Sequence, residues 1–339
     1  LMRAPSPPTP PGAVVVVDGA EAVCLGGDSI PQTAAGWLTE WTPAGVYTAM
    51  VTKRGQTQIV QWHEHVVRVR LMLSELVNSD PASFPGGLVL PPSDQAMEAL
   101  LRPTVELALE RLVEDQKLST EASGSNDVVD QSPRESMVVV AISPTSKGAW
   151  KIGAHAVVLP AVTSPQAPAK CVVVKNSARK LPSVKDTRWP SQRNEITLEV
   201  KHKFSATDAF AFDEILLSDV TDDVLLEGGV TNVFVVVEGV GTEGNTTTVV
   251  QTAPISQCLA GVGRASILKA CVALGITVVE TAPNLSQSDT WSEAFLTNAV
   301  RGVRRVGEIT WDDGNKVFSE KESEVTKRLA DFLAAKRTV

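Results

Sequence analysis

The stretch LPSVKDTRW, residues 181–189, is the part of the sequence around which the other suggestive motifs are arranged. On its own, Lys185 would be interpreted as a surface lysine in a turn. Two glycine-containing motifs follow it. The run EGGVTNVF at 227–234 comes after an apolar segment, and LAGVGR at 259–264 precedes a helix-patterned segment that ends at Gly275. The order of the three motifs, rather than any one of them, indicates a binding site.

This order resembles the fold-type IV, or class IV, pyridoxal-phosphate (PLP) enzymes. That family contains branched-chain and D-amino acid aminotransferases and 4-amino-4-deoxychorismate lyase. Two further matches lie upstream, Gly45-Val46-Tyr47 for a G-x-[YF] strand turn and His65 with Arg68 for an H-x-x-R helix. The resemblance covers roughly residues 45–306. The D-x-x-W after the lysine and VQTAPIS at 250–256 are similar to plant and algal aminotransferase-like proteins.

The resemblance implies an α/β (α+β) protein with the two-domain D-amino acid aminotransferase-like fold and PLP at the domain interface. The length of 339 residues and 43% hydrophobic content agree with two cores. Three prolines at 160–168 interrupt the apolar runs. We therefore expect a flexible Pro-rich leader at 1–12, a small N-terminal α/β domain at 13–160, an interdomain linker at 161–169 and a large PLP-binding domain at 170–339.

Charge and composition exclude several function classes. The net charge of −8 argues against nucleic acid as a partner. No apolar run is long enough to span a bilayer, so no membrane association is expected. The four cysteines and four histidines lack metal-ligand spacing, so no metal is expected. The compartment, cytoplasmic or plastid, is left open.

Local patterns predict most of the elements. In the first half we expect a strand at Val14–Val17, a hairpin of residues 45–52 and 56–61, a helix with an apolar stripe from Trp62 to Leu76, and a helix capped by Ser93 that Pro103 kinks or restarts. A mobile loop is expected at 117–136. It is followed by strands at 137–142, 151–159 and 171–174.

In the second half, strands are expected at 214–218, 224–227, 233–237, 247–252, 276–280, 294–300 and 306–310, with a helix at 262–274. Ser319 and Glu322 form a capping-box pattern before a closing helix whose buried face is Val325, Leu329, Phe332 and Leu333.

A PLP enzyme needs a lysine for the Schiff base, a group for the pyridine nitrogen and a phosphate cradle. The resemblance gives Lys185 the first role, with proton transfer, and Glu227 the second. Arg68 suits a phosphate because its guanidinium binds oxygens bidentately, and a helix N-terminus at Val262 and Gly263 offers unpaired amides. The remaining expected cofactor contacts are Thr231, Asn232, Asn298 and Ala299. The expected substrate contacts are Tyr47, Thr48 and Arg301.

The sequence departs from the family at two places. Arg188-Trp189 stands where an asparagine or an asparagine-tyrosine pair usually follows the lysine, so the group that bonds the phenolic oxygen of PLP is left open. Gly263 stands where many members carry threonine, so a side-chain hydroxyl is lost while the amide stays.

Three functions follow from the resemblance. The first is a PLP-dependent aminotransferase that moves an amino group between an amino acid and a 2-keto acid. The second is 4-amino-4-deoxychorismate lyase, which eliminates pyruvate to give 4-aminobenzoate and would use Thr48 as a proton relay. The third is a PLP-binding protein without turnover. The family also implies a homodimer, whereas the substrate and the preference for D- or L-amino acids are left open.

Overall fold

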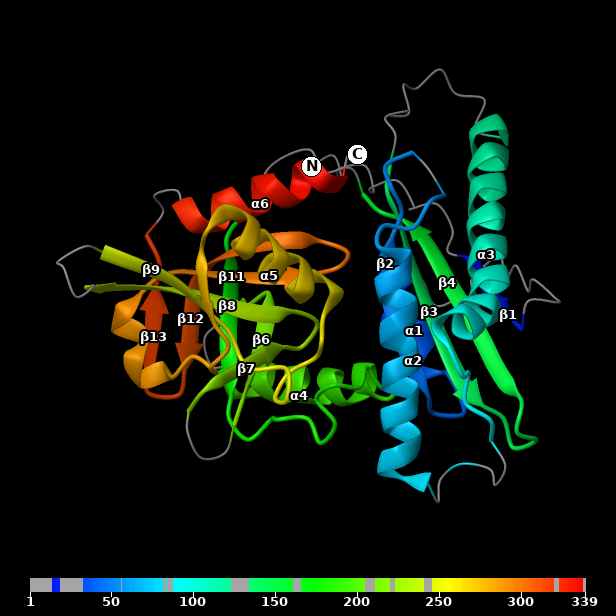
Figure 1. Cartoon of the computed structure of the whole chain (residues 1–339), viewed down its shortest axis with the longest axis horizontal. Coiled ribbons are helices and arrows are strands. Elements are labelled where there is room, and N and C mark those ends of the chain that lie inside the picture. Colours follow the sequence, from blue (N-terminus) through cyan, green and yellow to red (C-terminus); the bar gives the residue numbers. More distant parts are fainter. Residues whose placement is uncertain are drawn as a thin grey trace, which may run out of the picture.

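The computed structural model describes residues 14–18, 33–55, 57–81, 84, 88–122, 134–160, 166–204, 211–219, 223–240, 246–319 and 323–337. The leader predicted at 1–12 and residues 123–133 of the predicted loop lie outside this set. Two sheets stand side by side in Figure 1, one with four strands and one with nine. No described helix has both the length and the apolar character needed to cross a membrane.

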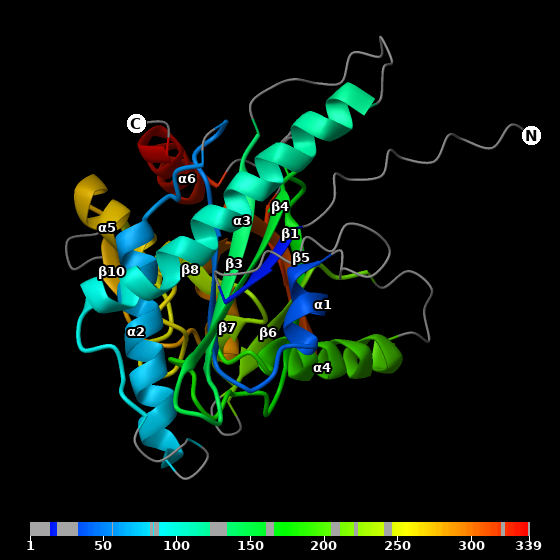
Figure 2. The same cartoon turned by 90° about the vertical axis from the view of Figure 1, so that its right-hand side faces the viewer.

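The smaller sheet is antiparallel with the order β1-β4-β3-β2. Its strands are β1 (Val14–Val17), β2 (Val46–Val51), β3 (Ser136–Pro144) and β4 (Trp150–Val158). Helices α2 (Trp62–Ser79) and α3 (Asp94–Ala122) cover one face, and α1 (Ala34–Thr39) lies on the other (Figure 2). Because side chains alternate along a strand, Val46 and Met50 enter the core under α2 and α3, while Tyr47 packs with Trp37 of α1.

The larger sheet is mixed, with the order β10-β9-β8-β11-β12-β5-β6-β7, and β13 pairs with β12. Its strands are β5 (Ala169–Val174), β6 (Glu214–Ser218), β7 (Leu225–Gly228), β8 (Asn232–Val240), β9 (Thr246–Gln251), β10 (Thr277–Val279), β11 (Trp291–Asn298), β12 (Gly302–Trp311) and β13 (Gly314–Val317). Helices α5 (Val262–Leu274) and α6 (Glu324–Arg337) cover one face, over the stacked rings of Phe234 and Phe295. The 3-10 helix η2 (Leu285–Thr290) and helix α4 (Trp189–Phe204) complete this half.

The lysine segment joins the two halves through backbone pairing with the start of β2. The amide of Tyr47 donates to the carbonyl of Lys185 at 2.9 Å, and the amide of Thr187 donates to the carbonyl of Gly45 at 2.9 Å. A side chain at Gly45 is impossible without movement, since a Cβ there would lie 2.1 Å from the carbonyl oxygen of Ile142. The pairing therefore fixes Lys185 at the junction of the two sheets.

Most predicted elements of the second half are confirmed, including a helix at Val262–Leu274 that ends at Gly275 in the left-handed conformation. The buried face of α6 is also confirmed. The boundaries 13–160, 161–169 and 170–339 stay a prediction, although the sheets divide between β4 and β5.

Several local predictions are wrong. The predicted hairpin is shorter than expected: Ile59 bridges Thr52, and the amides of Lys53 and Val60 donate to the carbonyls of Gln58 and Val51. Along its own length β2 pairs instead with the distant β3. Helix α3 does not restart at Pro103, which lies inside it, and it reaches Ala122, so residues 117–122 are not loop. Helix α6 begins at Glu324, so Ser319 does not cap it. The sequence patterns do not predict helices α1 and α4 or strand β13. For α4 the reason is its polar and weakly amphipathic sequence.

Candidate active site

Lys185 lies half-buried in the loop between β5 and α4, with its Nζ 5.1 Å from the ring centroid of Tyr47. Burial and, to a smaller extent, the positive charges of Arg68 and Arg179 together lower the pKa of Lys185 to about 7, although Glu227 opposes the shift. Burial also raises the pKa of Tyr47 to about 12. At neutral pH, Lys185 therefore has a large neutral fraction beside a protonated phenol.

Glu227, at the end of β7, is held by a buried arginine that sequence reasoning did not select. Arg179 Nε and Nη2 both lie 2.7 Å from Glu227 Oε1, and the two side chains are 9% and 5% exposed. The amide of Leu259 donates to Glu227 Oε2 at 3.0 Å. Burial raises the pKa of Glu227, while Arg179 and the Leu259 amide oppose the shift. Only the folded chain reveals this pair, since 48 residues separate its members.

Arg179 also holds the lysine segment itself. Its Nη1 donates to the carbonyl of Val184 at 2.7 Å, and its Nη2 donates to the carbonyl of Pro182. One guanidinium therefore links Glu227 to the residue directly before Lys185.

The N-terminus of α5 lies against the end of β11. Val262 and Gly263 are both buried in its first turn. A Cβ at Gly263 would lie 2.8 Å from the carbonyl carbon of Asn298, so the close approach needs glycine. Asn298 Oδ1 accepts from the amides of Val300 at 3.1 Å and Arg301 at 2.7 Å, which shapes the turn that contains Ala299. Arg301 itself is exposed.

Thr231 and Asn232 hold the loops around this cluster. Asn232 Nδ2 donates to the carbonyl of Leu259 at 2.9 Å, so Glu227 and Asn232 fix the same residue. Thr231 Oγ1 donates to Glu214 Oε2 at 3.2 Å. The two glycine-containing motifs are therefore joined through Leu259.

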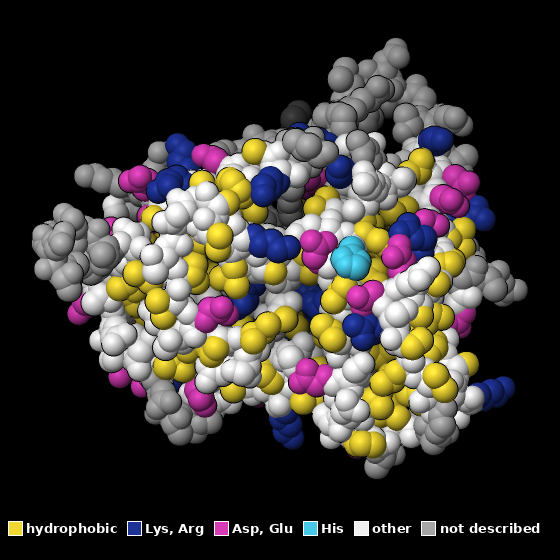
Figure 3. Space-filling view, viewed as in Figure 1, with side chains coloured by type: hydrophobic (Ala, Val, Ile, Leu, Met, Phe, Trp, Pro, Cys, Tyr) yellow, Lys and Arg dark blue, Asp and Glu magenta, His cyan; other side chains and the backbone are white. Residues whose placement is uncertain are grey.

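Arg68 is 8% exposed on the face of α2 that packs against β2. Burial lowers its pKa to about 10, so the guanidinium remains charged at neutral pH. Its Nη2 donates to Thr48 Oγ1. The space-filling view shows a hollow between the two halves with basic side chains at its border (Figure 3).

The residues that depart from the family pattern are engaged elsewhere. Trp189 is buried at the start of α4, and its indole Nε1 donates to the carbonyl of Gly229 at 2.7 Å. The Arg188 guanidinium pairs with Asp186 and is exposed. These contacts leave the donor for the phenolic oxygen of PLP unassigned among the described residues.

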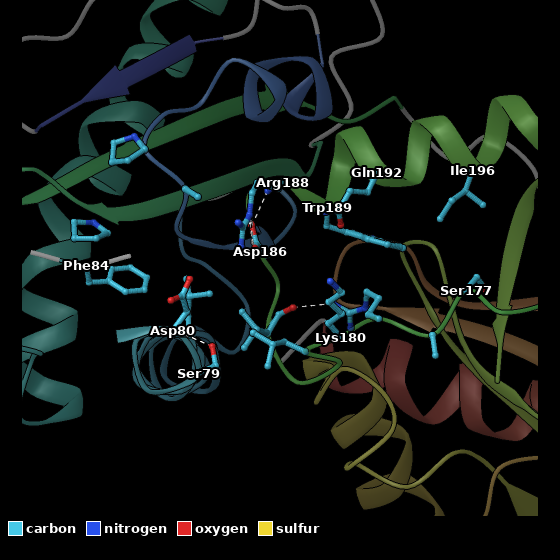
Figure 4. A pocket seen from close by; sticks show the side chains of 18 of the residues that line it. Ser79, Asp80, Phe84, Ser177, Lys180, Asp186, Arg188, Trp189, Gln192 and Ile196 are labelled. Atoms are coloured by element: carbon cyan, nitrogen blue, oxygen red, sulfur yellow. Dashed lines mark hydrogen bonds and ion pairs between the residues drawn. The ribbon is translucent and has the colours of Figure 1, made fainter. Parts of the chain in front are cut away.

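A cavity of about 1150 Å³ lies next to the lysine segment (Figure 4). Trp189 and Lys180 line it, together with Phe84 from beyond the end of α2. Its lining includes Arg179 and Val184 but, among the described residues, not Lys185, Glu227 or Arg68. The cavity therefore adjoins the cluster and meets it at Arg179.

Comparison with solved structures gives the same fold. A hypothetical aminotransferase from Mycobacterium tuberculosis in its PLP-bound form is 17% identical, with 94% of this chain and 98% of that chain covered and a TM-score of 0.62. The branched-chain amino acid aminotransferase of Escherichia coli is 16% identical, with 97% and 95% covered and a TM-score of 0.60. A Legionella pneumophila structure, provisionally described as a 4-amino-4-deoxychorismate lyase, is 17% identical, with 91% and 97% covered and a TM-score of 0.51.

A search of curated proteins found no match. The sequence pattern described as amino-transferase class IV matches residues 45–309, a span that contains β2, α2, the lysine segment, Glu227 and the N-terminus of α5. Together with the shared two-domain architecture, this match places the chain in the class IV aminotransferase family.

Proposed function

We propose that the protein is a PLP-dependent aminotransferase that moves an amino group between an amino acid and a 2-keto acid, with Lys185 as its catalytic residue. The cofactor of the family is PLP. The observation that carries the proposal is the placement of a lysine of lowered pKa beside Arg68, Arg179 and Glu227. A desolvated amine near other cations is the environment that activates a lysine as nucleophile and base.

The residues present fit a phosphate group. Arg68 Nε is buried and has no hydrogen-bond partner among the described residues. The first amides of a helix have no intrahelical partner, and α5 begins at Val262 and Gly263. The missing side chain at Gly263 lets this end approach Asn298. Arg68 and the α5 N-terminus would therefore hold the phosphate between them.

Glu227 would contact the pyridine nitrogen. Its oxygens accept from Arg179 and from the Leu259 amide, and a carboxylate keeps further lone pairs for a third donor. Because burial raises its pKa, Glu227 attracts a proton more strongly than an exposed carboxylate. It would therefore favour the protonated ring.

Lys185 would attach the cofactor and then move a proton. When bound, PLP supplies an electron sink that stabilises negative charge developing at the substrate Cα. With a pKa of about 7, Lys185 Nζ can take up the Cα proton at neutral pH and release it again. The backbone pairing with β2 keeps Nζ in place, and the ring of Tyr47 covers it on one side.

The lyase is the second candidate. The feature that favours it is the Asn298-Ala299 pair, which lies against the N-terminus of α5 and resembles the lyase sequence. The same Lys185 chemistry would then expel pyruvate. A substrate-carboxylate contact by Arg301 also stays a prediction, since this residue is exposed.

Half-reactions separate the candidates. Purified protein with PLP is mixed with single D- or L-amino acids, and the conversion of the cofactor to its amine form is followed by absorbance. The proposal predicts conversion by at least one amino acid and reversal by a 2-keto acid. Release of pyruvate from 4-amino-4-deoxychorismate without such exchange would establish the lyase instead. A bound cofactor that no amino donor or lyase substrate changes would leave only PLP binding without turnover.

We also propose a homodimer, as the family implies, located in the cytoplasm or the plastid. Light scattering after gel filtration measures the mass directly, against 36.1 kDa for one chain. A mass of one chain at micromolar concentration would contradict the dimer.

A further inference from the structure

A buried chain of hydrogen bonds links Arg68 to two residues with no assigned structural role. Arg68 Nη2 donates to Thr48 Oγ1, and Thr48 Oγ1 lies 2.8 Å from His65 Nδ1. Thr48 comes from β2, whereas His65 and Arg68 are one turn apart on α2. Thr48 and His65 are 1% and 2% exposed, so water does not compete for these bonds.

The chemistry of the groups fixes the direction of the first bond and allows one for the second. A guanidinium has only donors, so Thr48 Oγ1 must accept from Arg68. The single hydroxyl hydrogen of Thr48 is then free to donate to His65 Nδ1, which requires the ring proton to be on Nε2. Burial and the charges of Arg68 and Lys185 hold the pKa of His65 well below its usual value, so the ring is neutral and Nδ1 can accept.

The chain engages one nitrogen of the Arg68 guanidinium and leaves a second one without a partner among the described residues. Nη2 is bound to Thr48, while the buried Nε has no partner among the described residues. A long side chain that is held at one terminal nitrogen loses most of its rotational freedom before a ligand arrives, which reduces the entropic cost of binding. A guanidinium held in this way is preorganised for an anion.

We propose that Thr48 and His65 are positioning residues that hold Arg68 in the orientation that binds the phosphate of the cofactor. This inference rests on the proposed function, since it assumes PLP as the ligand. It gives Thr48 a role different from the substrate contact or proton relay that the resemblance suggested, because its hydroxyl contacts both Arg68 and His65.

The test compares two ligands, PLP and pyridoxal, which lacks the phosphate. Thr48→Val removes the hydroxyl with little change of shape, and Thr48→Ser retains it. Because a hydrogen bond to a charged group is lost, Thr48→Val should weaken PLP binding about ten- to a hundredfold. Pyridoxal binding should not change, and Thr48→Ser should bind PLP almost as the wild-type protein does.

A second pair of variants tests His65. His65→Asn keeps an oxygen acceptor near the position of Nδ1, whereas His65→Leu has none, so the former should retain more affinity for PLP. If Thr48→Val does not fold, as judged by circular dichroism, this pair carries the comparison. Nitrogen NMR of labelled histidine should show Nδ1 without a proton in the wild-type protein; a proton on Nδ1 would overturn the inference.

The outcomes also separate the inference from the proposed function. In one outcome the wild-type protein binds PLP, but Thr48→Val and His65→Leu weaken the binding of PLP and of pyridoxal equally, or weaken neither. The positioning role is then wrong, and the proposed function stands. If the wild-type protein binds no PLP at all, both are wrong.

Discussion

Replacing Arg179 by methionine should destabilise the protein far more than the same change at Arg188. Both arginines follow β5 closely, and each pairs with a carboxylate. The Arg179 and Glu227 side chains are 9% and 5% exposed, whereas the Arg188 side chain is 60% exposed. The two positions therefore form a matched pair that differs mainly in burial.

The magnitude follows from that difference. Removing one partner of a buried ion pair leaves an uncompensated charge and costs ~3–5 kcal/mol. Arg179→Met removes the partner of Glu227 and also the donors to the carbonyls of Val184 and Pro182. An exposed pair contributes about 0–1 kcal/mol, which bounds the effect of Arg188→Met.

The assay is equilibrium unfolding in urea at neutral pH, followed by circular dichroism and by tryptophan fluorescence. Trp189 reports on this region directly, since the Arg179 guanidinium lies 5.4 Å from its ring centroid. Adding Glu227→Gln to Arg179→Met should recover part of the loss, because no unpaired charge is then buried. Equal losses for Arg179→Met and Arg188→Met, or no recovery in the double variant, would refute this account of the pair.

Three further predictions concern the lysine, the helix N-terminus and the core. The lowered pKa of Lys185 means that the unfolded chain binds an extra proton between about pH 7 and 10.5, so the free energy of unfolding should rise with pH there; Lys185→Met should flatten this rise, and an unchanged slope would contradict the shift. Gly263→Ala places a Cβ 2.8 Å from Asn298 and should weaken PLP binding in a spectroscopic titration, while Lys269→Ala on the exposed face of α5 should not. Phe295→Ala removes a fully buried, stacked ring and should cost ~3–5 kcal/mol in urea unfolding; a loss below about 1 kcal/mol would mean that this core is loosely packed.

The motifs could be recognised because each one consists of residues that are close together in the sequence. The helix that ends at Gly275, the buried Glu227 and the turn around Lys185 each depend on a few neighbouring residues, and all were expected. The fold class followed from the resemblance that these motifs carry. Arg68 is buried although it was expected off the apolar stripe of its helix, and its contact with the cofactor stays a prediction.

The errors concern features that only distant parts of the chain decide. The main partner of β2 is β3, about 90 residues later, whereas the local pattern could indicate only the short turn that pairs residues 51–53 with 58–60. Proline at position 103 does not end α3, because packing against the small sheet stabilises the helix beyond it. No periodicity marks Arg179 or the bond from Thr48 to His65, since their importance depends on which groups they meet.

The central claim is that Lys185 attaches PLP, and one measurement tests it most directly. The protein is mixed with PLP, reduced with borohydride, digested and mapped by mass spectrometry, with Lys180 in the same region as an internal comparison. The account predicts a single modified peptide in which Lys185 carries the cofactor. A label on Lys180 or on several lysines, or no label at all, would contradict the assignment of the active site.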